Sequence, residues 1–305
     1  MHDAAAAFRR WFAVLNPTSG RGHALRHRER IEAALRAQGL ETQIVISKYA
    51  GHALPLISQA LDAGERNIMA IGGDGTMHEA VNAIQQHSAA ASVTLAPLPV
   101  GTGNDWCRCL KVPSDYATIA ARCARGRTEQ VDVGEARFAS GAPPRYFVNV
   151  AGAGFDAYVL QRMPDRRMGA LAYLVAVLRG LTGYRPQPMR VECDTASIDG
   201  RAFVAFVCIG AYCGGGMHVA PSANPRDGEF DVVHIGDLGR LDVLASLRRL
   251  FDGTIASHPK VRTLRTRSIT IDAPTPVAVE ADGELVGDTP VTLSVLPGAL
   301  RVIAG

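Results

Sequence analysis

Two hydrophobic patterns alternate along the first 133 residues of the chain. Short apolar runs bounded by Gly, Pro, Ser and Asp predict strands, and the segments between them carry helical spacing of apolar residues. The predicted strands are 11–15, 42–46, 67–71, 93–98 and 130–133. The predicted helices are 28–38, 52–63, 77–86 and 114–125. Because strands that alternate with helices are typical of parallel βαβ units, this half predicts a doubly wound, Rossmann-like α/β domain.

From residue 134 onward the pattern becomes β-rich. The predicted strands are 146–150, 189–193, 202–209, 230–235, 268–271, 277–280 and 291–295. Helical spacing at 168–181 and 241–251 interrupts them, which predicts a sandwich-like domain with added helices rather than a pure sandwich. We therefore expect two domains, residues 1–133 and residues 134–305.

The composition is that of a folded globular protein, with 47% hydrophobic and 20% charged residues in 305. A net charge of +3 is too small to point to nucleic acid as a partner. Six cysteines without a CxxC motif disfavour zinc and structural disulfides. The first residues do not resemble a signal peptide, and the longest apolar stretch is about half of a membrane span. The sequence therefore predicts a cytoplasmic protein.

Three unusual loops follow predicted strands of the first domain, at residues 16–20, 72–76 and 99–105. In a doubly wound sheet, ligands bind beyond the carboxyl ends of the strands, where such loops meet. Three glycines within 72–75 leave the backbone N–H groups open to an anion at the start of the following helix. Together the loops predict a site for the phosphates of a nucleotide.

Each loop also has a simpler interpretation. The first could be an ordinary Asx or Ser turn. Thr76 and Glu79 have the spacing of a capping box, and Asn104 or Asp105 could be the N-cap of a short helix. Capping explains neither the glycines nor Asp74 among them, and it does not explain why three such loops follow strands of one sheet. The functional interpretation is therefore favoured.

A further glycine pattern in the second domain does not change this picture. Gly152, Gly154 and Ala157 match the GxGxxA fingerprint loosely, but no acidic residue lies between Asp165 and Glu192 to bind a ribose. A dinucleotide-dependent oxidoreductase is therefore disfavoured.

The three loops, with the sequences AsnProThrSerGly, GlyGlyAspGlyThrMetHisGlu and ProValGlyThrGlyAsnAsp, resemble the signature of a lipid kinase family. This family includes bacterial diacylglycerol kinases, YegS-type lipid kinases and sphingosine kinases. The resemblance continues in the second domain at 152–156, 214–217, 220–231 and 282–284. It covers the chain from about Ala13 to Ile303.

The resemblance implies a nucleotide-binding α/β domain, a β-rich lipid-binding domain, and ATP-dependent phosphorylation of a lipid hydroxyl in a cleft between them. The acceptor would be diacylglycerol or a related glycerolipid, and the cofactors would be ATP and Mg²⁺. The implied nucleotide contacts are Asn16, Ser47, Gly73, Asp74, Gly75, Thr76, Met77, His78, Glu79, Thr102 and Asp105. The implied metal ligands are Asn224, Asp227 and Glu229, the outer two through backbone carbonyls.

Glu284 is implied as the proton acceptor, with Asp282 as its close neighbour and Asp74 as a further catalytic residue. Phosphoryl transfer requires the same residue types, since it depends on positioning, on charge neutralisation and on a carboxylate near the attacking hydroxyl. Asp74 and Asp105 are also candidates for magnesium coordination through water. Taken alone, residues 282–284 could instead be a plain hairpin turn, because AspGly is a favoured hairpin pair.

One residue departs from the pattern of many bacterial members. His78 stands where they carry Asn, which resembles the sphingosine kinases and keeps a sphingoid-base kinase as an alternative. An NAD kinase also uses a GlyGlyAspGly loop, but the third loop and the AspGlyGlu segment do not resemble that family. The non-enzyme alternative is a nucleotide-responsive lipid-binding protein.

The predicted helix 168–181 is apolar and has basic flanks. The flanking residues are Arg162, Arg166, Arg167, Arg179 and Arg185. Such a helix can lie in a bilayer interface and pair with anionic headgroups, so a membrane surface at the inner face is a candidate partner beside the lipid substrate. A helix that covers the protein core and has solvated ends is the alternative.

Overall fold

The computed structural model describes residues 8–163, 169–194 and 196–303. The chain divides into two compact units, one made of residues up to Val131 together with the end of the chain from Gly298, the other of Asp132–Pro297. It passes from the first unit to the second within β5 (Thr128–Phe138) and returns within β17 (Val291–Ile303). The last residues, which we expected in the second domain, thus belong to the N-terminal unit.

Four parallel strands form the sheet of the N-terminal unit, in the order β4-β3-β1-β2. They are β1 (Arg10–Leu15), β2 (Glu41–Ile46), β3 (Asn67–Gly72) and β4 (Thr94–Pro99). The register pairs Trp11 with Thr42 and Phe12 with Ile68. The end of β17 adds a fifth parallel strand beside β4, where Arg301 lies opposite Thr94. We expected residues 130–133 to close this series, but their strand β5 continues into an antiparallel pair with β6 (Arg145–Phe147).

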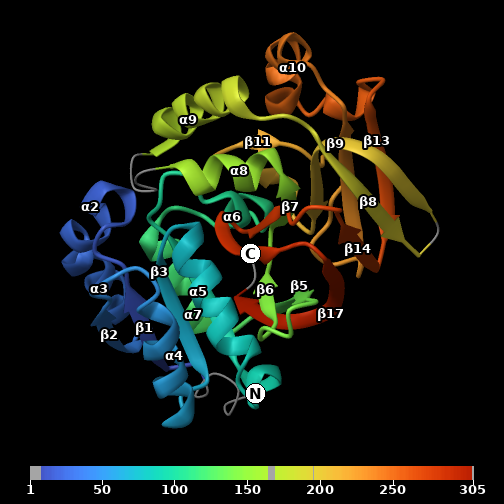
Figure 1. Ribbon diagram of the computed structural model, residues 1–305. Helices are drawn as coiled ribbons and strands as arrows, with labels where there is room; N and C mark the ends of the chain where they lie inside the picture. The colour runs from blue at the N-terminus through green and yellow to red at the C-terminus, as the bar shows by residue number, and fades with distance from the viewer. Residues whose placement is uncertain (1–7, 164–168, 195, 304–305) are drawn as a thin grey trace. The chain divides into compact units, whose positions relative to one another are not determined.

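Helices cover both faces of this sheet. They are α2 (Ser19–Arg26), α3 (Arg28–Ala37), α4 (Ala53–Asp62), α5 (Asp74–Gln85), α6 (Asp105–Cys109) and α7 (Tyr116–Arg125), with a 3-10 turn η1 (Ala90–Ser92). Trp11, Ala13 and Leu15 alternate along β1 and form one core with α2, α3 and α7. The helices α4 and α5 lie side by side and contact β1 and β3 (Figure 1, light blue and cyan). The predicted doubly wound domain is confirmed.

The C-terminal unit is built around the long strand β9 (Ser197–Cys208), which pairs antiparallel with three neighbours. These are β7 (Val150–Gly154), β8 (Gln187–Cys193) and β12 (Phe230–Gly236). The remaining strands are β13 (Val261–Thr266), β14 (Ser268–Asp272), β15 (Ala278–Ala281) and β16 (Glu284–Asp288), with a small hairpin of β10 (Tyr212–Cys213) and β11 (Met217–His218). The strand β16 stands at the end of the strand order and pairs with β15, so residues 282–284 connect the last two strands at the edge of the sheet.

Among the described residues, hydrophobic cores lie on both faces of β9. One lies among the strands and includes Phe147, Val207 and Leu293. The other joins the opposite face of β9, through Phe203 and Phe206, to three helices. These are α8 (Phe155–Arg162), α9 (Gly169–Gly183) and α10 (Arg240–Asp252), followed by the 3-10 turn η3 (Ile255–Ser257). Helix α9 packs along α8 (Figure 1, yellow-green). The β-rich, sandwich-like domain with added helices is confirmed.

The helix expected at 168–181 is α9. Met168, its expected first residue, and the predicted basic flanks Arg166 and Arg167 lie outside the described residues. Within the described parts of the chain, every helix is too short or too polar to cross a bilayer.

Candidate active site

The three predicted phosphate loops meet within the N-terminal unit. The Asn16 side chain donates from Nδ2 to Thr76 Oγ1 over 3.2 Å, which joins the first loop to the second. A Cβ atom on Gly20 would lie 2.1 Å from the carbonyl oxygen of Val100, and one on Gly101 would lie 2.6 Å from Gly73 Cα. The loops therefore touch through their backbones, at positions where only glycine fits.

The second loop leads directly into helix α5. The helix begins at Asp74 and its N-cap is Gly73, which has no side chain to satisfy the first N–H groups. Thr76 is therefore inside the first turn, and the capping-box interpretation of Thr76 and Glu79 is wrong. A helix start of this kind presents backbone N–H groups and the positive end of the helix dipole to an anion.

The third loop is closed by its own asparagine. Asn104 has a left-handed backbone (φ 54°), and its side chain accepts from Gly101 N over 3.1 Å and donates to Gly101 O over 2.8 Å. Asn104 stands at the N-cap position of α6 but makes no side-chain cap bond there. The carboxylate of Asp74 accepts a hydrogen bond of 3.3 Å from Trp106 N, and this bond ties the second loop to the start of α6.

Several predicted nucleotide contacts have other partners in the structure. Glu79 accepts hydrogen bonds from Gly51 N and Ala53 N, of 2.9 and 2.7 Å, and so holds the start of α4. Asp105 is almost fully buried and pairs with Arg108 over 2.7 Å.

Other predicted contacts differ in burial. Met77 and His78 are buried inside α5, and Asn82 donates from Nδ2 to the backbone oxygen of His78 over 2.9 Å. Ser47 is buried at the end of β2, while Thr102 is exposed on the third loop. Asn16, Gly73, Asp74, Gly75, Thr76 and Thr102 therefore lie on the touching loops, and Met77 and His78 lie beneath them.

In the C-terminal unit, residues 282–284 form the turn of the β15–β16 hairpin. Asp282 has a left-handed backbone (φ 52°) and is followed by Gly283 (φ 84°). The Asp282 carboxylate accepts from the backbone N–H groups of Val148, Asn149 and Val150 over 3.0, 2.9 and 3.3 Å. Asp282 thus fixes the turn, and Glu284 begins β16 as a half-buried residue.

The hairpin interpretation is therefore right, and the turn also carries the predicted carboxylates. The carboxylate of Asp282 anchors the hairpin, and the catalytic role of Glu284 stays a prediction.

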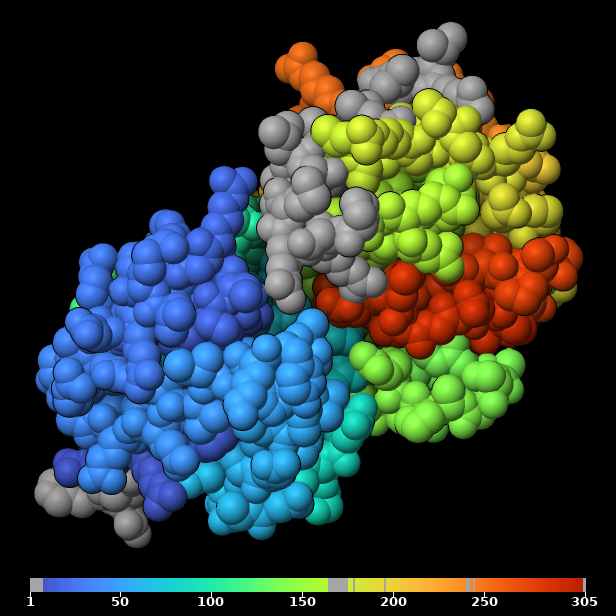
Figure 2. Space-filling view, turned by 60° about the vertical axis from the view of Figure 1, so that its left-hand side comes forward, coloured from blue at the N-terminus to red at the C-terminus, as the bar shows by residue number. Residues whose placement is uncertain are grey.

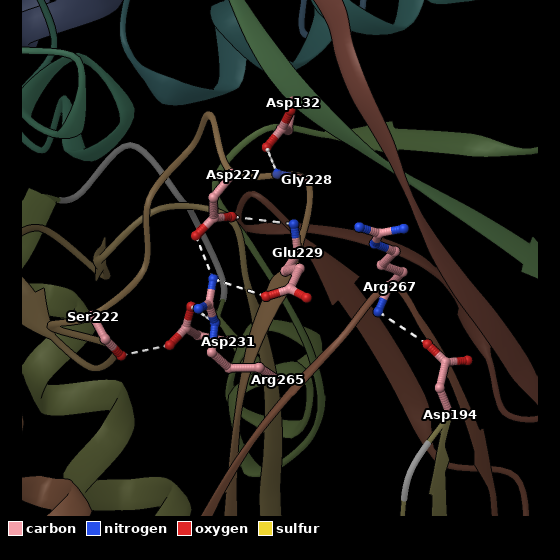
Figure 3. Close-up of polar contacts among 9 residues, drawn as sticks. All are labelled: Asp132, Asp194, Ser222, Asp227, Gly228, Glu229, Asp231, Arg265 and Arg267. Atoms are coloured by element: carbon pink, nitrogen blue, oxygen red, sulfur yellow. Dashed lines mark hydrogen bonds and ion pairs between the residues drawn. The ribbon is translucent and has the colours of Figure 1, made fainter.

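Two of the predicted metal ligands, Asp227 and Glu229, contact the side chain of Arg265 (Figure 3). Arg265 on β13 forms ion pairs with Asp227 and, over 3.0 Å, with Glu229. Its Nε lies 3.8 Å from Asp231, whose other oxygen accepts from Ser222 Oγ. Burial raises the pKa of Asp231, and the charges of Asp227 and Glu229 add to this effect. The pattern of residues gives no sign of Arg265, because its strand lies far along the chain from the acidic segment.

The backbone around this cluster is also held in place. Asp132 accepts from Gly228 N over 2.7 Å, and the carbonyl of Asn224 accepts from Arg226 N over 2.8 Å. The oxygen donors of Asn224, Asp227 and Glu229 are the kind that magnesium prefers, so they fit such an ion by chemistry. In the structure the guanidinium of Arg265 pairs with the carboxylate of Asp227, the one predicted ligand that would bind the ion through its side chain.

Known families match both halves of the chain. The diacylglycerol kinase catalytic domain matches residues 10–136, and the YegS C-terminal NAD kinase beta sandwich-like domain matches residues 149–304, which is half of the chain. The chain belongs to the diacylglycerol kinase family. The resemblance seen in the sequence is thereby confirmed, and so is the predicted enzyme class, a phosphotransferase with an alcohol acceptor.

Relatives of this diacylglycerol kinase family member cover almost its entire length. A diacylglycerol kinase of Mycobacterium tuberculosis is 30% identical over 295 residues, covering 95% of this chain and 94% of the relative. One of Staphylococcus saprophyticus is 27% identical and covers 91% and 89%. A crystal structure of a diacylglycerol kinase from Bacillus anthracis has a TM-score of 0.74 at 23% identity and covers 97% of both chains. At that identity the structural likeness shows the fold.

Proposed function

We propose that this kinase transfers the γ-phosphoryl group of ATP to the hydroxyl of diacylglycerol or a related glycerolipid. The observation that carries the proposal is the contact of three glycine loops within one unit, at the carboxyl ends of parallel strands. Backbone N–H groups gathered in this way suit the phosphates of a nucleotide, and the relatives named diacylglycerol kinase support the acceptor.

In the proposed reaction, the chain mainly positions the reactants. The glycine loops hold the phosphates, and Glu284 takes the proton from the lipid hydroxyl as its oxygen attacks the γ-phosphorus. A new O–P bond forms, the bond to the β-phosphate oxygen breaks, and ADP leaves with the electron pair. Asp282 does not exchange protons in this scheme, because three backbone N–H groups use its carboxylate to hold the turn.

Magnesium would accompany the nucleotide and neutralise phosphate charge. We keep Asp74 and Asp105 as candidates near the phosphates, and Asn224, Asp227 and Glu229 as the site for a second ion. An ion held there by the Asp227 carboxylate would compete with Arg265, whose side chain is half exposed.

The helical layer of the C-terminal unit also supports contact with a membrane. On α9, Ala176 and Val177 pack on the core, while Val175 and Arg179 are exposed. Arg162 at the end of α8, the helix that contacts α9, lies 3.5 Å from the ring centroid of Tyr158. An apolar side chain among cations suits an anionic lipid surface.

Transfer of labelled phosphate from ATP tests the function. We expect label on diacylglycerol when the protein is offered diacylglycerol, phosphatidylglycerol, ceramide, sphingosine and NAD with magnesium. Glu284→Gln should lower kcat by about 10²- to 10⁴-fold, the usual contribution of a general base. Glu192→Gln, an exposed carboxylate on β8, is the matched control and should leave kcat unchanged. Label on sphingosine or NAD alone, or full activity of Glu284→Gln, would overturn the proposal.

A further inference from the structure

Two carboxyl groups are buried together behind the 282–284 turn. Asp156 is the second residue of α8, and Glu280 lies on β15, two residues before the turn. Both are almost fully buried, with 8% and 6% of their surface exposed, and the two side chains lie close enough to influence each other's pKa. Asp156 Oδ2 is buried and receives no hydrogen bond from the described residues. Figure 2 shows the hairpin (red) at the surface of the C-terminal unit beside α8 (yellow-green), which contacts both of its strands.

One oxygen of each carboxyl group accepts a hydrogen bond from the backbone. Ala157 N donates to Asp156 Oδ1 over 2.7 Å, which holds one end of the pair to the start of α8. Gly283 N donates to Glu280 Oε2 over 2.8 Å, which holds the other end to the centre of the turn. The pair is thus a direct link between a packed helix and the residue that precedes Glu284.

The neighbouring strand leaves space for this link. A Cβ atom on Gly152 would lie 1.7 Å from Asp156 Oδ2, so a larger residue there would displace the carboxyl group. A Cβ atom on Gly154 (φ 126°) would lie 2.7 Å from the Phe203 carbonyl oxygen. The glycines that loosely matched a dinucleotide fingerprint therefore make room for Asp156 and for close strand packing.

Burial and mutual repulsion decide the charge of the pair. Burial raises the pKa of Asp156 to about 6, and burial followed by the charge of Asp156 raises the pKa of Glu280 well above its usual range. The charge of Asp282 adds to the effect on Glu280, and burial and Asp156 raise the pKa of the Tyr184 hydroxyl, which donates to Phe203 O. Two adjacent buried carboxylates do not both ionise readily, because each negative charge disfavours the other.

We propose that Asp156 and Glu280 share one proton and act as a positioning pair, which holds Gly283 and thereby places Glu284 for the kinase reaction. The inference rests on the proposed function of Glu284. The pair touches no substrate in this scheme and acts only through the turn.

The sign of the pH dependence follows from the raised pKa values. A carboxyl group that binds its proton more tightly in the folded protein stabilises the fold below its unfolded pKa, and this contribution disappears as the pH rises through the folded pKa. When the pair loses its last proton, repulsion between the carboxylates loosens the turn. Activity should therefore fall on the alkaline side before the fold is lost.

Substitutions of Glu280 test whether the shared proton controls the pH dependence of the kinase reaction. In Glu280→Gln, the amide oxygen can accept from Gly283 N while its NH₂ group donates to Asp156, and this arrangement cannot lose a proton. The alkaline fall of kcat should move to higher pH or disappear, with KM little changed. Glu280→Leu keeps the side-chain size but cannot accept from Gly283 N, so kcat should fall by at least about tenfold. Glu192→Gln, the exposed control, should retain the profile of the unsubstituted protein.

Two measurements do not depend on activity. Carbon-13 NMR of labelled glutamate should show one carboxyl group that titrates far above the others and is missing in Glu280→Gln. Hydrogen exchange of the segment 278–288 should quicken at alkaline pH in the unsubstituted protein and not in that variant. The proposed positioning pair is overturned if kcat falls at the same alkaline pH in the unsubstituted protein and in Glu280→Gln. It is also overturned if no carboxyl group titrates far above the others. If no lipid is phosphorylated, the proposed function fails, and these two measurements still decide the pair.

Discussion

The glycine loops of the N-terminal unit and the acidic turn of the C-terminal unit are built in opposite ways. The loops approach each other where side chains are missing, as between Gly73 and Gly101 or between Gly20 and Val100. The turn is held by side chains. The carboxylates of Asp282 and Glu280 accept hydrogen bonds from backbone N–H groups of the turn and of the segment beside it.

The two regions should therefore tolerate different kinds of substitution. The loops should withstand changes of polarity better than any added atom, because their geometry depends on close backbone contact. The turn should withstand added volume better than the loss of an acceptor, because its backbone donors would then be buried without partners.

The largest expected effect is that of one methyl group in the loops. In Gly101→Ala, the new Cβ would lie 2.6 Å from Gly73 Cα and 2.7 Å from Asn104 Oδ1, so the second and third loops must separate. A displacement of about 1 Å at a phosphate site costs about 100-fold in rate, and nucleotide binding should weaken as well. Steady-state kinetics and nucleotide titration would measure both.

Gly239→Ala is the matched control for this prediction, since its Cβ meets an ordinary contact of 3.6 Å at Asp242. Equal kinetics for Gly101→Ala and the control would show that the loops do not depend on close backbone contact.

The next effect concerns the anchor of the turn. Asp282→Asn keeps a side chain that tolerates the left-handed backbone but replaces one acceptor oxygen by an NH₂ group. Because the carboxylate serves three backbone donors, we expect the free energy of unfolding to fall by about 1–3 kcal/mol and kcat to fall with it. Chemical denaturation and initial rates would measure this. Asp199→Asn on the exposed edge of β9 should change neither quantity. If Asp282→Asn behaves like that control, the turn is held by other contacts.

The sequence could predict the loops because their signals are local. The apolar run of β3 followed by three glycines in four residues predicts both a strand and a bend, without any knowledge of the rest of the fold. The start of α5 was less visible. Helical spacing predicts a helix that starts at residue 77, and the capping pattern predicts Thr76 as its N-cap, but the helix begins at Asp74. The sequence does not mark this start, because the N-cap is Gly73, which has no side chain.

The contacts that shape the C-terminal unit could not be predicted, because they join distant residues with no pattern of their own. Asp156 and Glu280 lie 124 positions apart, and hydropathy marks both as surface residues although both are buried. Arg265 meets Asp227 across 38 positions, through the pairing of β12 with β13. The strand β13 was missed because its exposed arginines hide the alternation of apolar positions.

The smallest expected effect is on binding to a membrane. It is tested by substituting one exposed apolar side chain in each unit. Val175 on α9 is 39% exposed, and Leu25 on α2 is 47% exposed. If α9 contacts the bilayer, Val175→Asp removes apolar area worth about 1 kcal/mol and should lower the partitioning onto anionic liposomes about fivefold at low salt. Leu25→Asp introduces the same charge on the other unit and should leave co-sedimentation unchanged. Equal losses in both variants would mean that net charge rather than α9 governs the binding, and no binding by the unsubstituted protein would remove the membrane as a partner.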